Sequence, residues 1–218
     1  MSGHLHAAMI LRMVSSQLEC PIQSLTGWMA KRFLEKKNEI LEVNAAKLAQ
    51  IQPGSTVLEV GFGPGLGLQE ALRYLTDSEG KLYGLDYSEY MLKVATRRVQ
   101  EQISSGKLQL ILGSVEAIPL PDSSLDRVFH CNCYYYWTDL KKCCAELHRV
   151  MKPEGLMVAT INMIRMKKVV SQGLLLSKIW QPEIYMDALM ATGFKDVHIK
   201  DKEDRGLMFK AIFATASK

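Results

Sequence analysis

Residues 57–67 read Val-Leu-Glu-Val-Gly-Phe-Gly-Pro-Gly-Leu-Gly, so that an apolar run passes directly into a glycine cluster. Glycine tolerates positive φ angles and has no Cβ, so such a cluster lets the backbone turn tightly and approach a ligand closely. A strand that ends in glycines and opens a helix is typical of a nucleotide-type cofactor site. Residues 57–67 therefore predict the first strand, turn and helix of an α/β fold.

The chain on either side of this loop alternates short apolar runs with longer amphipathic ones. We expect strands at residues 56–60, 81–86, 107–112, 125–131 and 156–161, and helices at 66–75, 88–102 and 139–151. Alternation of this kind produces right-handed βαβ units and a parallel sheet covered on both faces. Residues 194–200 and 207–215 flank a charged turn and predict an antiparallel hairpin. The predicted class is α/β: a Rossmann-like doubly wound sheet, mostly parallel, with a C-terminal antiparallel hairpin and N-terminal helices.

The first fifty residues differ from the rest because they contain no strand pattern. Residues 25–50 are helical and rich in Lys and Glu, and Pro53-Gly54 stops them. The ligand crevice of a doubly wound sheet lies at the carboxyl ends of its strands. We therefore divide the chain into a helical segment, 1–50, and a cofactor-binding domain, 51–218. The segment is either a lid over the active site or a helix that is simply packed.

The composition of the 218 residues excludes several classes of protein. The 27 Lys and Arg outnumber the 23 Asp and Glu by four, and 48% of the residues are hydrophobic, as in an ordinary globular chain. This length favours one domain. No run reaches the roughly 20 apolar residues of a membrane span. The small net charge does not argue for a nucleic-acid partner.

The five cysteines exclude a complete set of internal disulfides because their number is odd. Cys131-x-Cys133 lacks the spacing and the second ligand pair of a zinc site, and Cys143 and Cys144 fall in a buried helical stripe. We therefore expect a reduced, cytoplasmic protein without a metal site. Residues 1–18 contain one Arg and no acid, a weak feature of a mitochondrial presequence.

The spacing of the glycines distinguishes between cofactors. The dinucleotide fingerprint G-x-G-x-x-G fails here because leucine stands at positions 66 and 68, where the last glycine would fall. The pattern is instead acid-x-Gly-x-Gly-x-Gly, formed by Glu59, Gly61, Gly63 and Gly65. A carboxylate at the strand end suits a ligand with an ammonium or sulfonium charge. Asp86 ends the second strand, where an acid can accept hydrogen bonds from both ribose hydroxyls.

Four motifs in order resemble the class I S-adenosylmethionine-dependent methyltransferases, and within them the small-molecule type 11 group that includes the ubiquinone-biosynthesis enzymes. They are the glycine loop, Leu85-Asp86, residues 113–122 (Gly-Ser-Val-Glu-Ala-Ile-Pro-Leu-Pro-Asp) with 125–129 (Leu-Asp-Arg-Val-Phe), and residues 146–155 (Glu-Leu-His-Arg-Val-Met-Lys-Pro-Glu-Gly). The resemblance covers residues 20–160 and implies S-adenosylmethionine as the cofactor. The cofactor-binding residues that it implies are Glu59, Gly61, Phe62, Gly63, Gly65, Asp86, Tyr87, Met91, Ser114, Val115, Cys131 and Asn132.

Two residues depart from the family pattern. Ser114 stands where many relatives have Asp, and a neutral hydroxyl is a weaker acceptor for the adenine amine. Glu154 replaces the first glycine of the usual Gly-Gly turn, which costs nothing if residue 154 does not need a positive φ.

The acceptor site is expected directly after the fourth strand, where the chain reads Tyr134, Tyr135, Tyr136 and Trp137. These rings could form an aromatic pocket or a cation–π cage, or some of them could pack under the rim as core. Methyl transfer from a sulfonium requires mainly alignment, which can supply about 7–11 kcal/mol, so no catalytic residue is assigned. We expect His130 and His148 to be packed or surface residues. Leu25, Trp28 and Met29, with residues 163–180, could wall an apolar pocket or belong to the core.

The sequence thus predicts a methyltransferase that acts on a small, lipophilic or aromatic metabolite. Three alternatives remain: a cofactor-binding protein without turnover, a nicotinamide-dependent oxidoreductase, which the glycine spacing opposes, and a methyltransferase of protein or nucleic acid. The last needs two basic groups to form one surface, namely Lys31, Arg32, Lys36 and Lys37 with Arg165, Lys167 and Lys168. Nucleic acid is not expected, because residues 132–135 lack the prolines of an Asn-Pro-Pro-Tyr motif. The sequence does not predict the oligomeric state.

Overall fold

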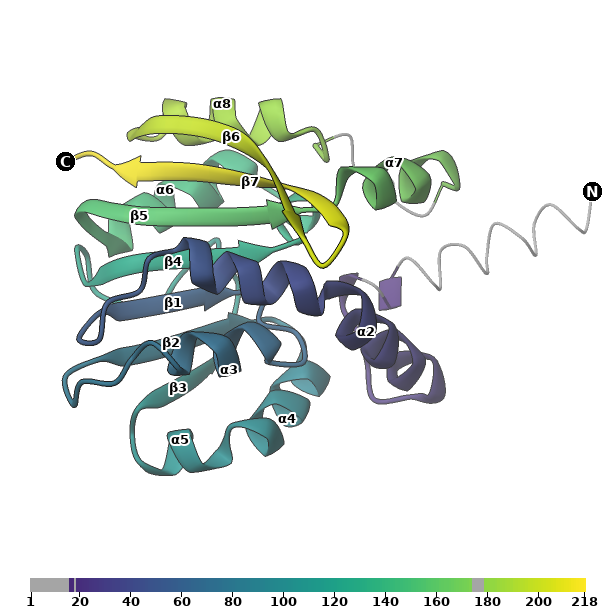
Figure 1. Cartoon of the computed structure of the whole chain (residues 1–218), viewed down its shortest axis with the longest axis horizontal. Coiled ribbons are helices and arrows are strands. Elements are labelled where there is room, and N and C mark those ends of the chain that lie inside the picture. Colours follow the sequence, from purple (N-terminus) through teal and green to yellow (C-terminus); the bar gives the residue numbers. More distant parts are fainter. Residues whose placement is uncertain (1–15, 18, 174–178) are drawn as a thin grey trace, which may run out of the picture.

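The computed structural model describes residues 16–17, 19–173 and 179–218. Seven strands of this part form one sheet in the order β3-β2-β1-β4-β5-β7-β6 (Figure 1). The strands are β1 (Thr56–Val60), β2 (Lys81–Asp86), β3 (Leu108–Leu112), β4 (Leu125–Cys131), β5 (Met151–Ile161), β6 (Phe194–Asp204) and β7 (Leu207–Ala216). Strands β1 to β5 are parallel, and β6 and β7 form an antiparallel hairpin beside β5. The predicted Rossmann-like α/β class is confirmed.

Helices cover both faces of this sheet (Figure 1). They are α2 (Leu25–Leu48), α3 (Leu66–Leu72), α4 (Glu89–Arg98), α5 (Gln100–Ser104), α6 (Leu140–Val150), α7 (Met163–Ser171) and α8 (Pro182–Ala191). Buried residues of α2, α3 and α4 form one core cluster with β1 and β2, and those of α6 and α8 form another with β4 and β5. The helix expected at 88–102 is divided into α4 and α5, because Val99 between them leaves helical geometry at φ −123°. The helix expected at 66–75 ends at Leu72.

The strand register brings the ends of three strands together. Val60 of β1 lies beside Leu85 of β2 and beside His130 of β4. Asp86 and Cys131 therefore follow at the same edge of the sheet, next to the glycine loop. The strand order reverses between β1 and β4, and ligands of doubly wound sheets bind outside the carboxyl ends of the strands at such a point.

Helix α2 begins near that end of the sheet and then runs along one face of it, against β4 and β5 (Figure 1). Its second half is core, since Leu41, Ala45 and Ala46 have no exposed surface. Two hydrogen bonds anchor it: Thr160 Oγ1 donates to the carbonyl of Leu41 at 3.0 Å, and Asn44 Nδ2 donates to Asp204 Oδ2 at 2.7 Å. The helix is thus packed, and its role as a lid stays a prediction.

The expectation that the first half of α2 contributes to an apolar pocket or to the core is wrong. Leu25, Trp28 and Met29 are 76%, 47% and 59% exposed, so they neither wall a pocket nor belong to the core. Segment 163–180, expected to accompany them, forms α7 as far as Ser171, and residues 174–178 fall outside the described part of the chain.

The expectation that Glu154 replaces glycine at no cost is also wrong. Glu154 adopts φ +63°, in the left-handed region that glycine favours. The condition for a cost-free replacement of glycine is therefore not met. The carboxylate of Glu154 pairs with Lys195 Nζ at 2.6 Å, but both side chains are exposed, and such pairs contribute little. The turn keeps backbone strain that a glycine would relieve.

All five cysteines are free thiols. Across the described ranges, no helix is long and apolar enough to cross a membrane. No group of three or more His, Cys, Asp or Glu side chains in the same ranges is placed to hold a metal ion.

Candidate functional site

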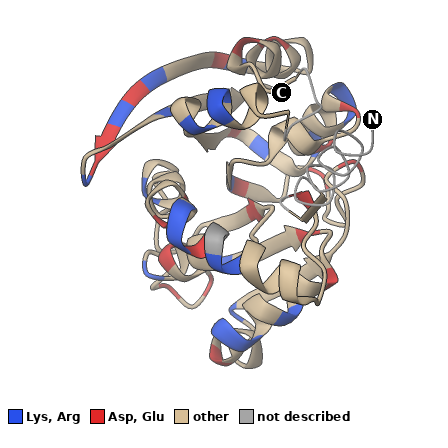
Figure 2. Cartoon of the chain, turned by 90° about the vertical axis from the view of Figure 1, so that its right-hand side faces the viewer, with Lys and Arg blue, Asp and Glu red and all other residues tan. Residues whose placement is uncertain are grey.

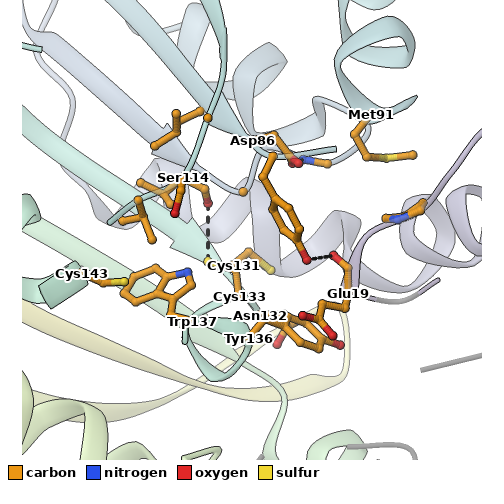
Figure 3. A pocket seen from close by; sticks show the side chains of 18 of the residues that line it. Glu19, Asp86, Met91, Ser114, Cys131, Asn132, Cys133, Tyr136, Trp137 and Cys143 are labelled. Carbon is orange, nitrogen blue, oxygen red and sulfur yellow. Dashed lines mark hydrogen bonds between the residues drawn. The ribbon is translucent and has the colours of Figure 1, made fainter. Parts of the chain in front are cut away.

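A cavity of about 220 Å³ opens at the carboxyl ends of β1, β2 and β4. Figure 3 shows Ser114, Asp86 and Met91 along one side of it and Trp137 and Tyr136 along the other, with Cys131, Asn132 and Cys133 between them. Of the predicted cofactor residues, nine line it: Gly61, Gly63, Asp86, Tyr87, Met91, Ser114, Val115, Cys131 and Asn132. Glu59, Phe62 and Gly65 lie outside the lining.

The three glycines of the loop have different surroundings. All three have positive φ angles, +68° at Gly61, +49° at Gly63 and +86° at Gly65. A Cβ on Gly61 would meet Cys133, and one on Gly65 would meet Ala95 of α4, so these two glycines allow close packing. A Cβ on Gly63 would meet nothing within 4 Å. Gly63 therefore presents bare backbone to open space in the cavity.

Asp86 joins the loop to the end of β2. Its two carboxylate oxygens accept hydrogen bonds from the backbone N–H groups of Gly63 at 2.8 Å and Ser88 at 2.9 Å. Burial raises the pKa of this carboxyl above its ordinary value, and the two N–H bonds oppose that rise. Each oxygen keeps a further lone pair, so Asp86 can accept from a ligand as well.

Two other carboxyl groups lie at the start of α3. Glu59 is 1% exposed, and a Cβ on Gly67 would come within 2.1 Å of Glu59 Oε1, so glycine is required there. Glu42 of α2 is 5% exposed and lines the cavity. Burial raises the pKa of Glu42 to about 8 and that of Glu59 well above its ordinary value. Oε2 of each has no hydrogen-bond partner within the part of the chain that the structure describes.

The side of the cavity assigned to adenine contains the ends of β2 and β3. Met91 is buried, whereas Tyr87 is 48% exposed and its hydroxyl donates to the carbonyl of Glu19 at 2.9 Å. The hydroxyl of Ser114 accepts from the backbone N–H of Glu116 at 3.2 Å. Ser114 therefore already uses one acceptor position within the protein.

The wall after β4 is tied to α2 and α7. Asn132, at φ +48°, donates from Nδ2 to Asn38 Oδ1 at 3.2 Å, and Arg165 Nη1 donates to the same oxygen at 2.8 Å. The thiol of Cys133 donates to the carbonyl of Val60 at 3.6 Å. Burial raises the pKa of the Cys131 and Cys133 thiols, so both stay protonated at neutral pH.

The four aromatic residues after β4 are divided between cavity and core. Tyr136 and Trp137 line the cavity. Tyr134 and Tyr135 are buried, and Tyr134 stacks on Tyr185 with ring centroids 4.4 Å apart. A second bond fixes Tyr134, whose hydroxyl donates to the carbonyl of Trp180 at 2.7 Å. Only the second half of this run thus faces the cavity.

His130 and His148 each contact residues outside the cavity. His130 has no exposed surface, and its Nε2 lies 2.7 Å from the Tyr185 hydroxyl. Burial lowers the pKa of His130 to about 3, so the ring is neutral. His148 Nε2 lies 2.8 Å from the carbonyl of Ser217. Neither histidine lines the cavity.

Sequence reasoning offered the N-terminal segment as a possible lid but did not predict which of its residues line the cavity. Glu19, Pro21, Asn38 and Glu42 all line the cavity. Asn38 and Glu42 are four residues apart, on the same face of α2 as the buried Leu41 and Ala45. Two polar residues within the apolar stripe of a predicted helix were the signal that could have revealed them. Further lining residues not predicted include Pro64, Glu116, Cys133, Thr138 and Cys143.

Comparisons with known proteins agree with this arrangement. The type 11 family model described as a methyltransferase domain matches residues 58–159. The uncharacterised methyltransferase YdaC of Bacillus subtilis is 36% identical over 134 residues, which make up 62% of this chain and 71% of that protein. The chain belongs to the class I S-adenosylmethionine-dependent methyltransferases. As the resemblance implied, this methyltransferase uses S-adenosylmethionine as its cofactor.

Other relatives of this methyltransferase are longer proteins. The demethylmenaquinone methyltransferase of Geobacillus kaustophilus is 39% identical over 115 residues, 50% of this chain and 45% of that protein. The sterol 24-C-methyltransferase erg6 of Aspergillus fumigatus is 30% identical over 105 residues, 48% of this chain and 27% of that protein. The chain therefore matches less than half the length of either relative.

A chain of the Haloferax volcanii complex between the Trm112 methyltransferase activator and a methyltransferase has the same fold. Its TM-score is 0.72 at 21% identity, and the match covers 88% of this chain and 95% of that one. The residues around the cavity also fit the cofactor of the family. Gly63 leaves space for it, Asp86 supplies acceptor oxygens, and Glu42 offers a buried carboxyl oxygen, Oε2, without a partner among the described residues.

Proposed function

We propose that this methyltransferase transfers the methyl group of S-adenosylmethionine to a small, lipophilic or aromatic acceptor. The observation that carries the proposal is the wall of the cavity opposite Asp86, where Tyr136 and Trp137 stand beside the neutral thiols of Cys133 and Cys143. Such a wall favours an apolar, planar small molecule over a charged macromolecule. Relatives named for demethylmenaquinone and for a sterol support the same class of acceptor.

The cofactor residues receive the roles implied by the family. The backbone of Gly61, Gly63 and Gly65 would back the methionine and ribose, with Phe62 packed beneath the loop, and Asp86 would accept from the ribose hydroxyls. Tyr87, Met91, Ser114 and Val115 would surround the adenine. Cys131 and Asn132 would face the methionine and the transferred methyl group, and Glu59 would support either the loop or the amino group. The cofactor supplies an electrophilic methyl group on a sulfonium, so the side chains need only align the acceptor and exclude water.

The Cys143 thiol and the Tyr136 hydroxyl at the acceptor wall do not act as bases at neutral pH. Burial raises the pKa of the Cys143 thiol to about 12 and that of the Tyr136 hydroxyl above its ordinary value, so both remain protonated. An acceptor that is already nucleophilic, or that ionises by itself, suits such a wall better than one that must lose a tightly held proton.

The N-terminal segment 1–50 would complete the site of domain 51–218. Asn38 and Glu42 of α2 close one side of the cavity, and Glu19 and Pro21 close its rim. The exposed first half of α2, anchored by a second half that is buried in the core, suits a lid that admits the two substrates. The five free thiols favour a cytoplasmic location.

The test is a transfer assay with S-adenosylmethionine labelled on its methyl group. The protein is incubated with a native extract, and the products are separated into an organic-extractable small-molecule fraction and a macromolecular fraction. Label in the small-molecule fraction supports the proposal and allows the acceptor to be identified. The Asp86→Asn variant is the control for label introduced by other enzymes of the extract.

A methyltransferase of an anionic macromolecule is the second candidate, because the two basic groups are adjacent. Arg165 Nη2 donates to the carbonyl of Lys37 at 2.8 Å, which brings α7 against the basic part of α2. Figure 2 shows Lys and Arg on both helices at the end of the molecule where the parallel strands terminate. Label confined to macromolecules in the same assay would favour this candidate and contradict the first.

A further inference from the structure

Glu42 and Glu59 meet at one point of the fold, although they come from α2 and β1. The backbone N–H of Gly67, in the first turn of α3, hydrogen-bonds to Glu42 and thereby lowers its pKa in opposition to burial. Glu59 Oε1 lies where a Cβ of Gly67 would be. The two carboxyl groups therefore share the start of α3, close enough that the charge of Glu42 raises the pKa of Glu59.

Each of the two carboxyl groups keeps one oxygen unsatisfied. Among the described residues, Oε2 of Glu42 and Oε2 of Glu59 are both buried without a hydrogen-bond partner. A buried carboxylate without a partner is strongly unfavourable, so it binds either a proton or a cation. Arg98, which lowers the pKa of Glu42, uses Nη2 to pair with Glu35 Oε1 at 2.5 Å and Nη1 to donate to Gln69 Oε1 at 3.1 Å, and no hydrogen bond joins its buried Nε to Glu42.

The direction from which a partner can come is the cavity. Glu42 lines the cavity, whereas Glu59 lies behind the glycine loop. The other acid of the cavity floor, Asp86, already accepts two backbone N–H bonds. Among the acids that line the cavity, Glu42 is thus the one whose buried carboxyl group has an oxygen without a partner in the described part of the chain, and a primary ammonium group can donate to it and neutralise it.

We propose that Glu42, backed by Glu59, receives the ammonium group of the cofactor and releases its own proton to solvent when that group binds. This inference rests on the placement of the cofactor proposed above. The ammonium group keeps its three protons, the Glu42 O–H bond breaks, and the proton passes to the buffer. Glu59 keeps its proton, because two adjacent buried carboxyl groups do not both ionise.

Other charged groups act on Glu42 and set the pH range. Glu35 and Asp86 raise its pKa together with burial, Arg98 lowers it, and the Cys131 thiol is a neutral neighbour. Since Glu42 titrates at about 8 without ligand, it is protonated at pH 6.5. Release of one proton makes the affinity for the cofactor rise about tenfold per pH unit below that value.

The experiment is calorimetric titration at pH 6.5 in two buffers with different ionisation enthalpies, which measures the protons released per ligand bound. The ligands are S-adenosylmethionine, S-adenosylhomocysteine, which keeps the ammonium but not the sulfonium charge, and 5′-methylthioadenosine, which lacks the amino-acid part. The wild-type protein should release about one proton with the first two ligands and none with the third. Equal release with all three, or no release with any, would overturn the inference.

Glu42→Gln tests the residue, and Glu39→Gln is its matched control. Glu39 is on the same helix, is exposed and pairs with Arg205 at 3.3 Å. Glu42→Gln should abolish proton release and lower the affinity for S-adenosylmethionine and S-adenosylhomocysteine at least about tenfold. Its affinity for 5′-methylthioadenosine should be unchanged, which would show that the site is folded. Unchanged release from Glu42→Gln would overturn the assignment. If no ligand binds the wild-type protein, the proposed cofactor placement itself fails.

Discussion

Asp86 accepts a hydrogen bond from the backbone N–H of Gly63 at 2.8 Å, across the end of β2 and the glycine loop. The carboxylate therefore holds the loop in its cavity-facing conformation as well as offering oxygens to a ligand. Asp86→Asn should weaken S-adenosylmethionine binding by about 1.5–3 kcal/mol, because it removes charged-acceptor hydrogen bonds and turns an amide N–H group toward Gly63 or Ser88. Calorimetric titration measures the change.

The matched control for Asp86→Asn is Asp126→Asn. Asp126 Oδ2 accepts from the backbone N–H of Thr56 at 2.8 Å, at the opposite end of β1. The Asp126→Asn substitution removes the same kind of hydrogen bond far from the cavity. Cofactor affinity should therefore be unchanged, while the stability of the fold falls. Equal affinity losses from both variants would show that Asp86 acts only through stability.

Gly63→Ala should weaken cofactor binding at least about tenfold, because its methyl group enters the cavity where the backbone meets the ligand. At φ +49° the new side chain is also strained. Gly106→Ala controls for that strain, since Gly106 has φ +71° and open space around its Cβ position but lies in the turn before β3. Both variants should lose about 1 kcal/mol of stability, and only the first should lose affinity. Full affinity in Gly63→Ala would contradict the placement of the loop.

The sequence predicted the part of the site whose spacing is local. The glycines, Asp86 and the residues after β4 lie at strand ends, and parallel strands bring their ends to one edge. Glu42 and Asn38 could not be found in this way, because their place depends on how α2 crosses the sheet. The roles of Tyr134 and Tyr136 also could not be predicted from the sequence. They are two residues apart in a short 3₁₀ turn, and only the packing of Tyr134 on Tyr185 decides which of them faces the cavity.

Glu154→Gly should raise the free energy of unfolding by about 0.5–1 kcal/mol. The left-handed φ of +63° costs a non-glycine residue about 1–2 kcal/mol, whereas the exposed pair with Lys195 contributes little because solvent screens it. Glu154→Ala separates the two effects, because it removes the pair and keeps the strain, and it should be slightly destabilising. Chemical denaturation measures both. A loss of stability in Glu154→Gly would mean that the ion pair outweighs the strain.

The pH dependence of stability should identify Glu42 without any ligand. Its pKa is about 8 in the folded protein, against 4.5 for an unperturbed glutamate side chain, so between these values the folded state binds more protons than the unfolded state. The free energy of unfolding therefore falls as the pH rises from 4.5 to 8, by up to about 1.4 kcal/mol per pH unit for one proton. Below that window the contribution of Glu42 is complete, and above it the contribution is lost. In Glu42→Gln this slope should be smaller, since the amide does not titrate, whereas Glu39→Gln should keep the wild-type slope. Urea denaturation at pH 5.5, 6.5 and 7.5 compares the three proteins. If the free energy of unfolding depends on pH in the same way in all three proteins, Glu42 is not the group that is protonated in the folded state.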